Sequence, residues 1–235
     1  MSAWKAKRFW TKTEVQAFDG GFTIRLDARP VKTPAKAAFV VPSLAMAQAC
    51  AAEWEAQSGL IRPDTMPMTR YANSAIDKVA HQHADVVDIV AAYGETDLLC
   101  YRATEPEALI ARQSAGWDAH LNWAATDLDA RLSVTQGVIP IPQDAASLTN
   151  LRRLTAACDP FQLAPFHDFV AITGSLILGL AMAKGRLTAD EAFSLSRIDE
   201  HWQAELWGHD EDAAQMESGK RAALSEALRF FRYHG

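Results

Sequence analysis

Strand-type sequence is confined to the first 41 residues of this 235-residue chain, which restricts the fold more than any other feature. Segments that alternate apolar and polar residues surround Gly20-Gly21, and paired glycines tolerate the positive φ of a tight hairpin turn. Ser43 then has the position of a helix cap, and Gly59 marks the end of that helix. These signals predict a small antiparallel sheet accompanied by one helix.

Helical patterns dominate the remainder of the chain, and one helix is expected over residues 163–184, where Pro165 marks its start and Gly185 its end. Pro63 and Pro67 lie in a stiff connector, so we place a domain boundary on its far side. We therefore expect an α+β protein with a small α+β domain over residues 1–70 and a mainly α-helical domain over residues 71–235. Within the second domain, residues 97–103 and 131–142 have extended character, and we expect them to form a short pair.

Charge and cysteine content exclude several classes of function. The chain carries 23 basic and 29 acidic residues, a net charge of −6, and its longest basic run is KAKR near the start. This balance argues against nucleic-acid binding and against an anionic membrane surface. The 3 cysteines lie far apart without metal-binding spacing, which favours a reducing compartment. We expect a cytoplasmic protein without membrane insertion, because there is no signal-like core and the longest apolar run is shorter than a membrane span of about 20 residues.

Residues 188–212 combine a strong helix signal with polar groups that folding does not require. Thr188 and Glu191 have the spacing of a capping box, which predicts a helix from Ala189 to Asp212. One stripe of this helix is apolar and is expected to be buried; it consists of Ala192, Leu195, Ile198, Trp202 and Leu206. Asp199 lies on the same stripe, so its carboxylate needs a hydrogen-bonding partner inside the protein or outside it.

A second face of the same helix carries acids, an amide and an indole. An exposed aromatic residue among polar side chains is typical of an interface anchor, so we predict a partner-binding site here. Its residues are Asp199, Glu200, Gln203, Trp207 and Glu211. The negative charge of the chain favours a basic or neutral protein as the partner.

Motifs of catalysis are absent from the sequence as we interpret it. No GxSxG elbow occurs, and no Lys-Ser/Thr follows the glycines at 174 and 179. The alternative function is a metal- or ligand-dependent small-molecule enzyme that uses His209, Asp210 and Glu211 between the two domains. A third reading is a general holdase for unfolded chains.

Seven sequence blocks together resemble the assembly-chaperone family of the soluble catalytic head of ATP synthase. The blocks occupy residues 26–36, 51–57, 66–77, 95–103, 134–143, 173–181 and 196–208, and they include MPMTRYANSAID and SRIDEHWQAELWG. The resemblance implies two domains, no enzymatic activity, no cofactor, and binding of the unassembled alpha subunit until it joins beta.

The same resemblance implies roles for individual residues. It places the family's functional acidic position at Asp199 or Glu200, and it makes Trp54 a structural residue. Because the chain begins without the presequence of mitochondrial relatives, we expect a bacterial member. We also expect a monomer when no partner is bound.

Overall fold

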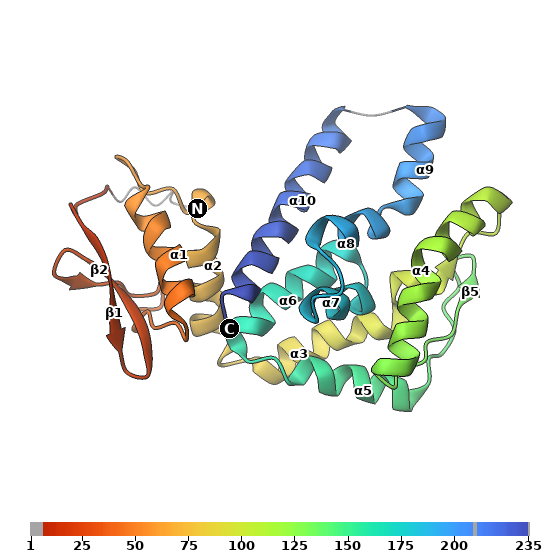
Figure 1. Ribbon diagram of the computed structural model, residues 1–235, viewed down its shortest axis with the longest axis horizontal. Coiled ribbons are helices and arrows are strands. Elements are labelled where there is room, and N and C mark those ends of the chain that lie inside the picture. The colour runs from red at the N-terminus through yellow and green to blue at the C-terminus, as the bar shows by residue number, and fades with distance from the viewer. Residues whose placement is uncertain (1–6, 209–210, 235) are drawn as a thin grey trace. The chain divides into compact units, whose positions relative to one another are not determined.

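The computed structural model describes residues 7–208 and 211–234 (Figure 1). The three strands of the antiparallel sheet come first and mainly helices follow, as the sequence predicts. The strands are β1 (Thr13–Phe18), β2 (Gly21–Leu26), β3 (Arg29–Pro30), β4 (Tyr101–Arg102) and β5 (Thr135–Gln136). The α-helices are α1 (Leu44–Glu55), α2 (Pro67–Ser74), α3 (His83–Ala91), α4 (Glu107–Asp127), α5 (Ala145–Ala156), α6 (Pro160–Thr173), α7 (Leu176–Ala183), α8 (Ala189–Ser196), α9 (Ile198–Trp207) and α10 (Glu211–Arg232). The α+β class is therefore confirmed.

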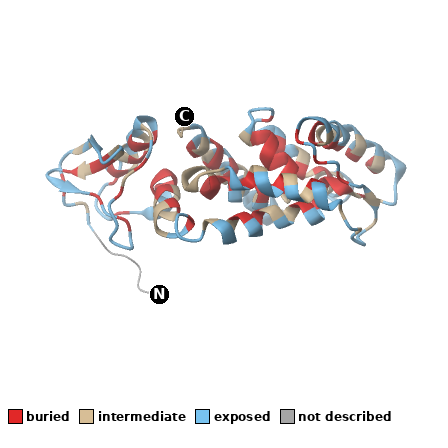
Figure 2. Ribbon diagram, turned by 90° about the horizontal axis from the view of Figure 1, so that it is seen from below, coloured by how far each residue is buried: buried red, intermediate tan, exposed pale blue. Residues whose placement is uncertain are grey.

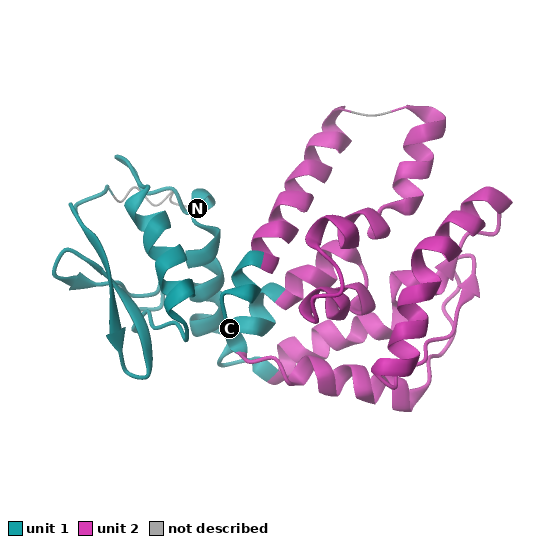
Figure 3. Cartoon of the chain, viewed as in Figure 1, with its two compact units in different colours: residues 1–83, 160–165, 229–235 teal, residues 84–159, 166–228 magenta. Residues whose placement is uncertain are grey.

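The chain divides into two compact units (Figure 3). Unit 1 contains residues 1–83, 160–165 and 229–235, and unit 2 contains residues 84–159 and 166–228. Parts of α6 and α10 thus belong to unit 1 although they lie far along the chain. The boundary at residue 70 between independent domains stays a prediction.

The sheet of unit 1 has the order β1-β2-β3, with antiparallel pairing throughout. Its first turn is formed by Asp19 and Gly20, whose φ values are 46° and 78°, and not by the expected pair Gly20-Gly21. Gly21 is instead the first residue of β2, and a Cβ atom there would lie 2.6 Å from the carbonyl oxygen of Val41. A side chain at position 21 would collide with the backbone at Val41, which pairs antiparallel with Phe22 through two hydrogen bonds.

An apolar core and one polar motif hold unit 1 together (Figure 2). Trp54 is 9% exposed and packs edge-on against Trp10 at 5.4 Å between ring centroids. The neighbouring Glu53 accepts the backbone N–H groups of Met68 and Thr69 at 2.7 and 2.8 Å, which satisfies donors in the first turn of α2. Glu53 and Trp54 therefore join the core of unit 1 to the start of α2.

In unit 2, β4 and β5 form a two-stranded parallel pair, which confirms the expected short extended pair. The sequence also predicts one helix over residues 163–184, and this expectation is wrong. Gly174 adopts a φ of 70°, and Ser175 caps the new helix α7 by accepting the N–H of Leu178. The chain breaks here because Asp97 occupies the N-terminal end of α7.

Asp97 is fully buried and receives hydrogen bonds on both carboxylate oxygens. Its Oδ1 accepts from the Leu99 N–H at 3.0 Å and from the Ser175 hydroxyl at 2.8 Å, and Oδ2 accepts from the Ile177 N–H at 3.0 Å. Burial raises the pKa of Asp97 to about 6, while the hydrogen bonds from Ile177, Leu99 and Ser175 lower it. This carboxylate joins the turn before β4 to the start of α7.

We expect Asp97→Asn to lower the free energy of unfolding by about 1–3 kcal/mol, because the amide offers one acceptor oxygen to the buried donors where the carboxyl group, protonated or not, offers two. The folded-state pKa of Asp97 lies above the usual aspartate value of 3.8, so the stability that this group contributes is complete below pH 3.8 and is lost as the pH rises through about 6. The penalty of the substitution should therefore be larger near pH 4 than near pH 7. Urea unfolding across this range measures it.

The control for this prediction is Asp88→Asn, because the Asp88 side chain is 58% exposed and bonds only Arg152 among the described residues. That variant should change stability by less than about 0.5 kcal/mol. A penalty at Asp97 that does not vary with pH would contradict a raised folded-state pKa.

Candidate protein-binding site

The stretch expected to be one helix over residues 189–212 is three segments. The capping box at its start is confirmed: Thr188 Oγ1 accepts the Glu191 N–H at 3.2 Å, and Glu191 accepts the Thr188 N–H at 2.8 Å. The chain then leaves helical geometry at Arg197, where φ is −116° and ψ is 19°, and α9 ends at Gly208 with a φ of 91°. His209 and Asp210, which the enzymatic alternative invokes, lie outside the described residues.

Contacts from other helices compensate for the break at Arg197. The Trp117 indole N–H donates to the Leu195 carbonyl at 2.8 Å, which satisfies an acceptor that a continuous helix would bond internally. Arg197 donates from Nη2 to the Ile172 carbonyl at 2.7 Å. The change of direction between α8 and α9 is therefore fixed by tertiary hydrogen bonds.

Helix α4 carries the residues that orient α9. A Cβ atom on Gly116 would lie 2.7 Å from Ile198 Cδ1, so the glycine allows the two helices to approach closely. One turn earlier, Arg112 binds both carboxylate oxygens of Glu205 at 2.7 and 3.0 Å and lies 4.8 Å from the ring centre of Trp202. The guanidinium lowers the pKa of Glu205, so this carboxylate is ionised at neutral pH.

Asp199 is half-buried and finds its expected partner inside the protein. The side-chain amide of Gln113 donates to Asp199 Oδ1 at 2.6 Å. Gln113 is 1% exposed, and its Oε1 accepts the Ala103 N–H at 2.8 Å, so the amide itself is held from both ends. In the part of the chain that the structure describes, Asp199 Oδ2 accepts no hydrogen bond. Gln113 thus orients the carboxylate through Oδ1, and Oδ2 can accept a hydrogen bond from another molecule.

The other predicted site residues are exposed. Glu200, Gln203 and Trp207 share one side of α9, and Trp207 is 78% exposed. Glu200 bonds Arg197 of the preceding turn at 2.6 Å. Glu211 is exposed in the first turn of α10, so it belongs to a different helix from the other four residues.

Additional apolar side chains lie close to these residues along the chain. Leu206 is 58% exposed, so its expected burial on the apolar stripe is wrong, and Met216 of α10 is 65% exposed. Residues 211–220 of α10 are all exposed except Glu217, which is partly buried. Glu217 bonds His201 of α9 at 2.9 Å. The ends of α9 and α10 that adjoin residues 209–210 therefore present apolar side chains among acids. We call α9 together with residues 211–217 of α10 the α9–α10 surface; its acidic residues are Asp199, Glu200, Glu205, Glu211, Asp212 and Glu217.

The sequence analysis missed the residues of α4 that support this surface. Gln113 lies four residues before Trp117 on the buried seam of α4, where a polar residue needs a partner of its own. This spacing indicates that Gln113 is buried and needs a hydrogen-bonding partner. The sequence does not reveal which partner it has, because Asp199 is 86 positions away.

Gln113→Leu is expected to lower the free energy of unfolding by about 1–3 kcal/mol, because leucine leaves the Ala103 N–H unpaired and removes the Asp199 hydrogen bond. Thermal or urea unfolding measures this change. The matched control is Gln82→Leu at an exposed position, which should change little. Equal stability of the two variants would contradict the linking role of Gln113.

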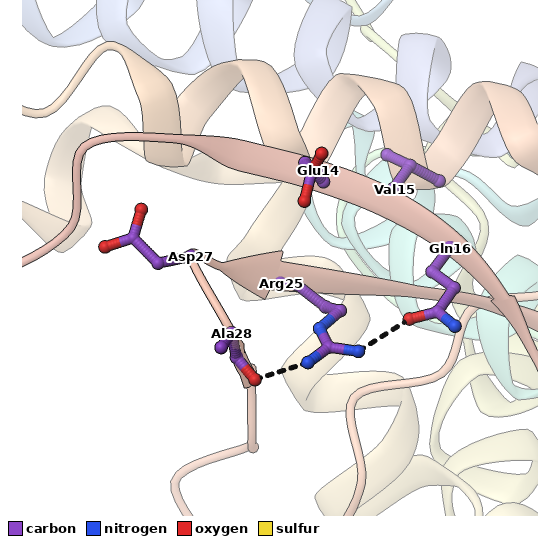
Figure 4. Close-up of a pocket in the computed structure, with 6 residues that line it drawn as sticks. All are labelled: Glu14, Val15, Gln16, Arg25, Asp27 and Ala28. Carbon is purple, nitrogen blue, oxygen red and sulfur yellow. Dashed lines mark hydrogen bonds between the residues drawn. The ribbon is translucent and has the colours of Figure 1, made fainter.

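A cavity in unit 1 is a weaker candidate for a functional site. A cavity of about 460 Å³ lies on the sheet of unit 1 (Figure 4). Its lining residues are Glu14, Val15, Gln16, Arg25, Asp27 and Ala28. Arg25 there bonds Gln16 and the Ala28 carbonyl, and Asp27 accepts hydrogen bonds from Thr11 and Lys12, so these polar groups already have partners.

Neither a metal site nor a reactive thiol is evident in the described ranges. Among residues 7–208 and 211–234, no group of three His, Cys, Asp or Glu side chains could hold a metal ion. Burial raises the pKa of the Cys100 thiol to about 12, so this group is not a thiolate at neutral pH. No helix in the described residues combines the length and the apolar content that crossing a bilayer requires.

Comparison with known proteins identifies the family. Residues 7–125 match the model of the family described as ATP12 chaperone protein. The crystal structure of Atp12 from Paracoccus denitrificans is similar, with a TM-score of 0.95 and 48% identity over 98% of this chain and 99% of that one. A mutant of the same protein gives a TM-score of 0.96 at 48% identity over the whole of both chains.

Two proteins of lower sequence identity also match this chain. A protein from Agrobacterium tumefaciens is similar with a TM-score of 0.92 and 40% identity, over 97% of this chain and 86% of that one. The mitochondrial protein atp12 of Schizosaccharomyces pombe is 25% identical over 90% of this chain and 77% of its own length. The fold and these matches define a chaperone. The chain belongs to the ATP12 chaperone family, which confirms the resemblance carried by the seven sequence blocks.

Proposed function

We propose that this protein binds the unassembled alpha subunit of the ATP synthase catalytic head and prevents its aggregation until it joins beta. Membership of the ATP12 chaperone family supports the proposal. The single observation that carries the site is the exposure of Trp207, 78%, on a helix whose Asp199 and Glu205 are oriented by hydrogen bonds from α4.

The proposed site consists of Asp199, Glu200, Gln203 and Trp207 on α9 together with Glu211 on α10. Unassembled subunits of a ring expose apolar interface that aggregates unless it is covered. In our proposal, Trp207 inserts into an apolar depression of the alpha subunit, and the carboxylates pair with Arg or Lys side chains around it. Charged contacts of this kind govern specificity and association rate more than affinity, which suits a partner that must later be released.

Between the two acids that the resemblance leaves open, the contacts favour Asp199 as the specificity-determining group. Its orientation is fixed by Gln113, and so less conformational entropy is lost when Oδ2 meets a cation. Glu200 is exposed and already paired with Arg197, so part of its charge is compensated within the chain. The proposed activity needs neither a cofactor nor a catalytic residue.

The proposed function is tested by the aggregation of purified alpha subunit, followed by light scattering. A chaperone specific for this subunit should suppress aggregation near a one-to-one ratio and should elute with the subunit as one complex of two chains. An unrelated heat-labile enzyme should aggregate at the same rate with or without the protein. Suppression of both substrates would support a general holdase, and suppression of neither would overturn the proposed function.

A further inference from the structure

Residues 133–143 form a loop whose two ends are joined by one side chain. Gln143 accepts the Ser133 N–H through Oε1 at 2.7 Å and donates from Nε2 to the Ser133 carbonyl at 3.0 Å. Between these ends, β5 pairs with β4, and the Gly137 N–H donates to the Arg102 carbonyl at 2.8 Å. The base of the loop, which contains β5 (Figure 1), is thus fixed to unit 2 by pairing with β4.

The tip of this loop is apolar and open to solvent. Val138 is 89% exposed and Ile139 is 75% exposed, and Val134 near the base is 46% exposed. Single exposed apolar residues are ordinary on a protein surface, but three within six positions on a loop with a fixed base are not. Holding these side chains in water has no benefit for folding, which indicates that they are covered by another molecule.

The composition of the loop defines the chemistry of that molecule. No residue from 132 to 143 is charged, in a chain where 22% of residues are. Pro140 and Pro142 lack the N–H group that a continuing strand requires, so the tip is unsuited to edge-to-edge pairing with a second copy. A matching surface is therefore apolar and uncharged, in contrast to the basic surface that suits the acids of α9 and α10.

A short series of hydrogen bonds connects the loop to the α9–α10 surface. Gly137 bonds the Arg102 carbonyl, the next residue, Ala103, bonds Gln113 Oε1, and Gln113 Nε2 bonds Asp199. All of these residues belong to unit 2. The loop and α9 thus belong to one unit, in which Gln113 bonds both Asp199 of α9 and Ala103, the residue after the one that holds the loop.

We propose that Val138 and Ile139 form a second contact for the alpha subunit, and that they cover an uncharged apolar strip of its exposed subunit interface. This inference rests on the proposed function and extends it, because α9 supplies the charged contact and the loop supplies the apolar one. Two contacts on one rigid unit raise affinity beyond that of either contact alone.

The test compares Val138→Ser/Ile139→Ser with Ile89→Ser, an apolar residue of α3 that is 58% exposed. Purified alpha subunit is titrated against each protein at low and at high salt. The loop variant should bind about tenfold or more weakly, with the salt dependence of the wild-type protein, because no charge is involved. The Ile89 variant should bind as wild type, and unfolding midpoints should agree for all three proteins.

Wild-type affinity in the loop variant would overturn the inference while leaving the proposed function intact. Self-association of the wild type that the loop variant abolishes, with binding of the alpha subunit unchanged, would assign the tip to a second copy and would also overturn it. Wild-type protein that does not bind the alpha subunit would remove the proposed function and this extension together.

Discussion

Exchanging Glu200 for lysine and Trp207 for alanine in one protein is expected to weaken binding of the alpha subunit by about a hundredfold or more, because aromatic anchors and reversed charges have the largest effects at interfaces. Both side chains are exposed, so their replacement leaves no cavity. The free energy of unfolding should change by less than about 1 kcal/mol. Titration calorimetry with purified alpha subunit measures the affinity.

The dependence of binding on ionic strength distinguishes the contribution of Glu200→Lys from that of Trp207→Ala. The loss caused by Glu200→Lys should shrink as ionic strength rises, since screening weakens exposed charge pairs, whereas the loss caused by Trp207→Ala should persist. The matched controls are Glu95→Lys and Ile89→Ala, which replace an exposed acid and an exposed apolar residue elsewhere in unit 2. Equal losses in the controls would remove the assignment of the site to α9.

Trp117→Ala is expected to lower the free energy of unfolding by about 3–5 kcal/mol, the range found when a buried aromatic residue is truncated. Trp117 is 1% exposed, donates to the Leu195 carbonyl at 2.8 Å, and lies 5.0 Å from the guanidinium of Arg102. The substitution therefore removes packing, a hydrogen bond and a cation–π contact at the junction of α4, α8 and α9.

A second substitution at this position separates packing from hydrogen bonding. Trp117→Phe keeps an apolar ring but leaves the Leu195 carbonyl without its donor, so we expect a loss of about 1–2 kcal/mol. Chemical unfolding of both variants measures the difference. Loss of less than about 1 kcal/mol in the alanine variant would contradict the central position of Trp117 in the core of unit 2.

Local signals in the sequence predicted much of the fold. The capping box at Thr188, the cap at Ser43 and the order of strands and helices all depend on residues within one turn of each other, and the structure confirms them. The short extended pair was also predicted, because residues 97–103 and 131–142 have extended rather than helical character, and β4 and β5 lie within these ranges.

Breaks created by distant contacts were not predicted. Nothing in the sequence near Arg197 interrupts a helix, and the break is stabilised by Trp117 and by the Ile172 carbonyl, which lie 78 and 25 positions from their partners. At Gly174 and Ser175 the stop and cap signals were present, but the sequence alone does not reveal Asp97, which bonds Ser175 across 78 positions.

The polar face of α9 was predicted more accurately than its apolar stripe. Glu200, Gln203 and Trp207 are exposed as their spacing indicates, whereas Leu206 is exposed although the stripe predicts burial. The stripe prediction assumed a helix buried along its whole length, whereas the hydrogen bonds from α4 that the structure describes reach α9 at Asp199 and Glu205, and Leu206 is 58% exposed. The binding role of these side chains stays a proposal.

The most direct test of the account places a photoreactive amino acid at position 207 and illuminates the protein with purified alpha subunit. The account predicts a cross-linked product at position 207, competed by unlabelled wild-type protein, and no product when the same group is placed at position 89 on α3. Cross-linking at position 89 but not at position 207 would contradict a client-binding surface on α9 and α10.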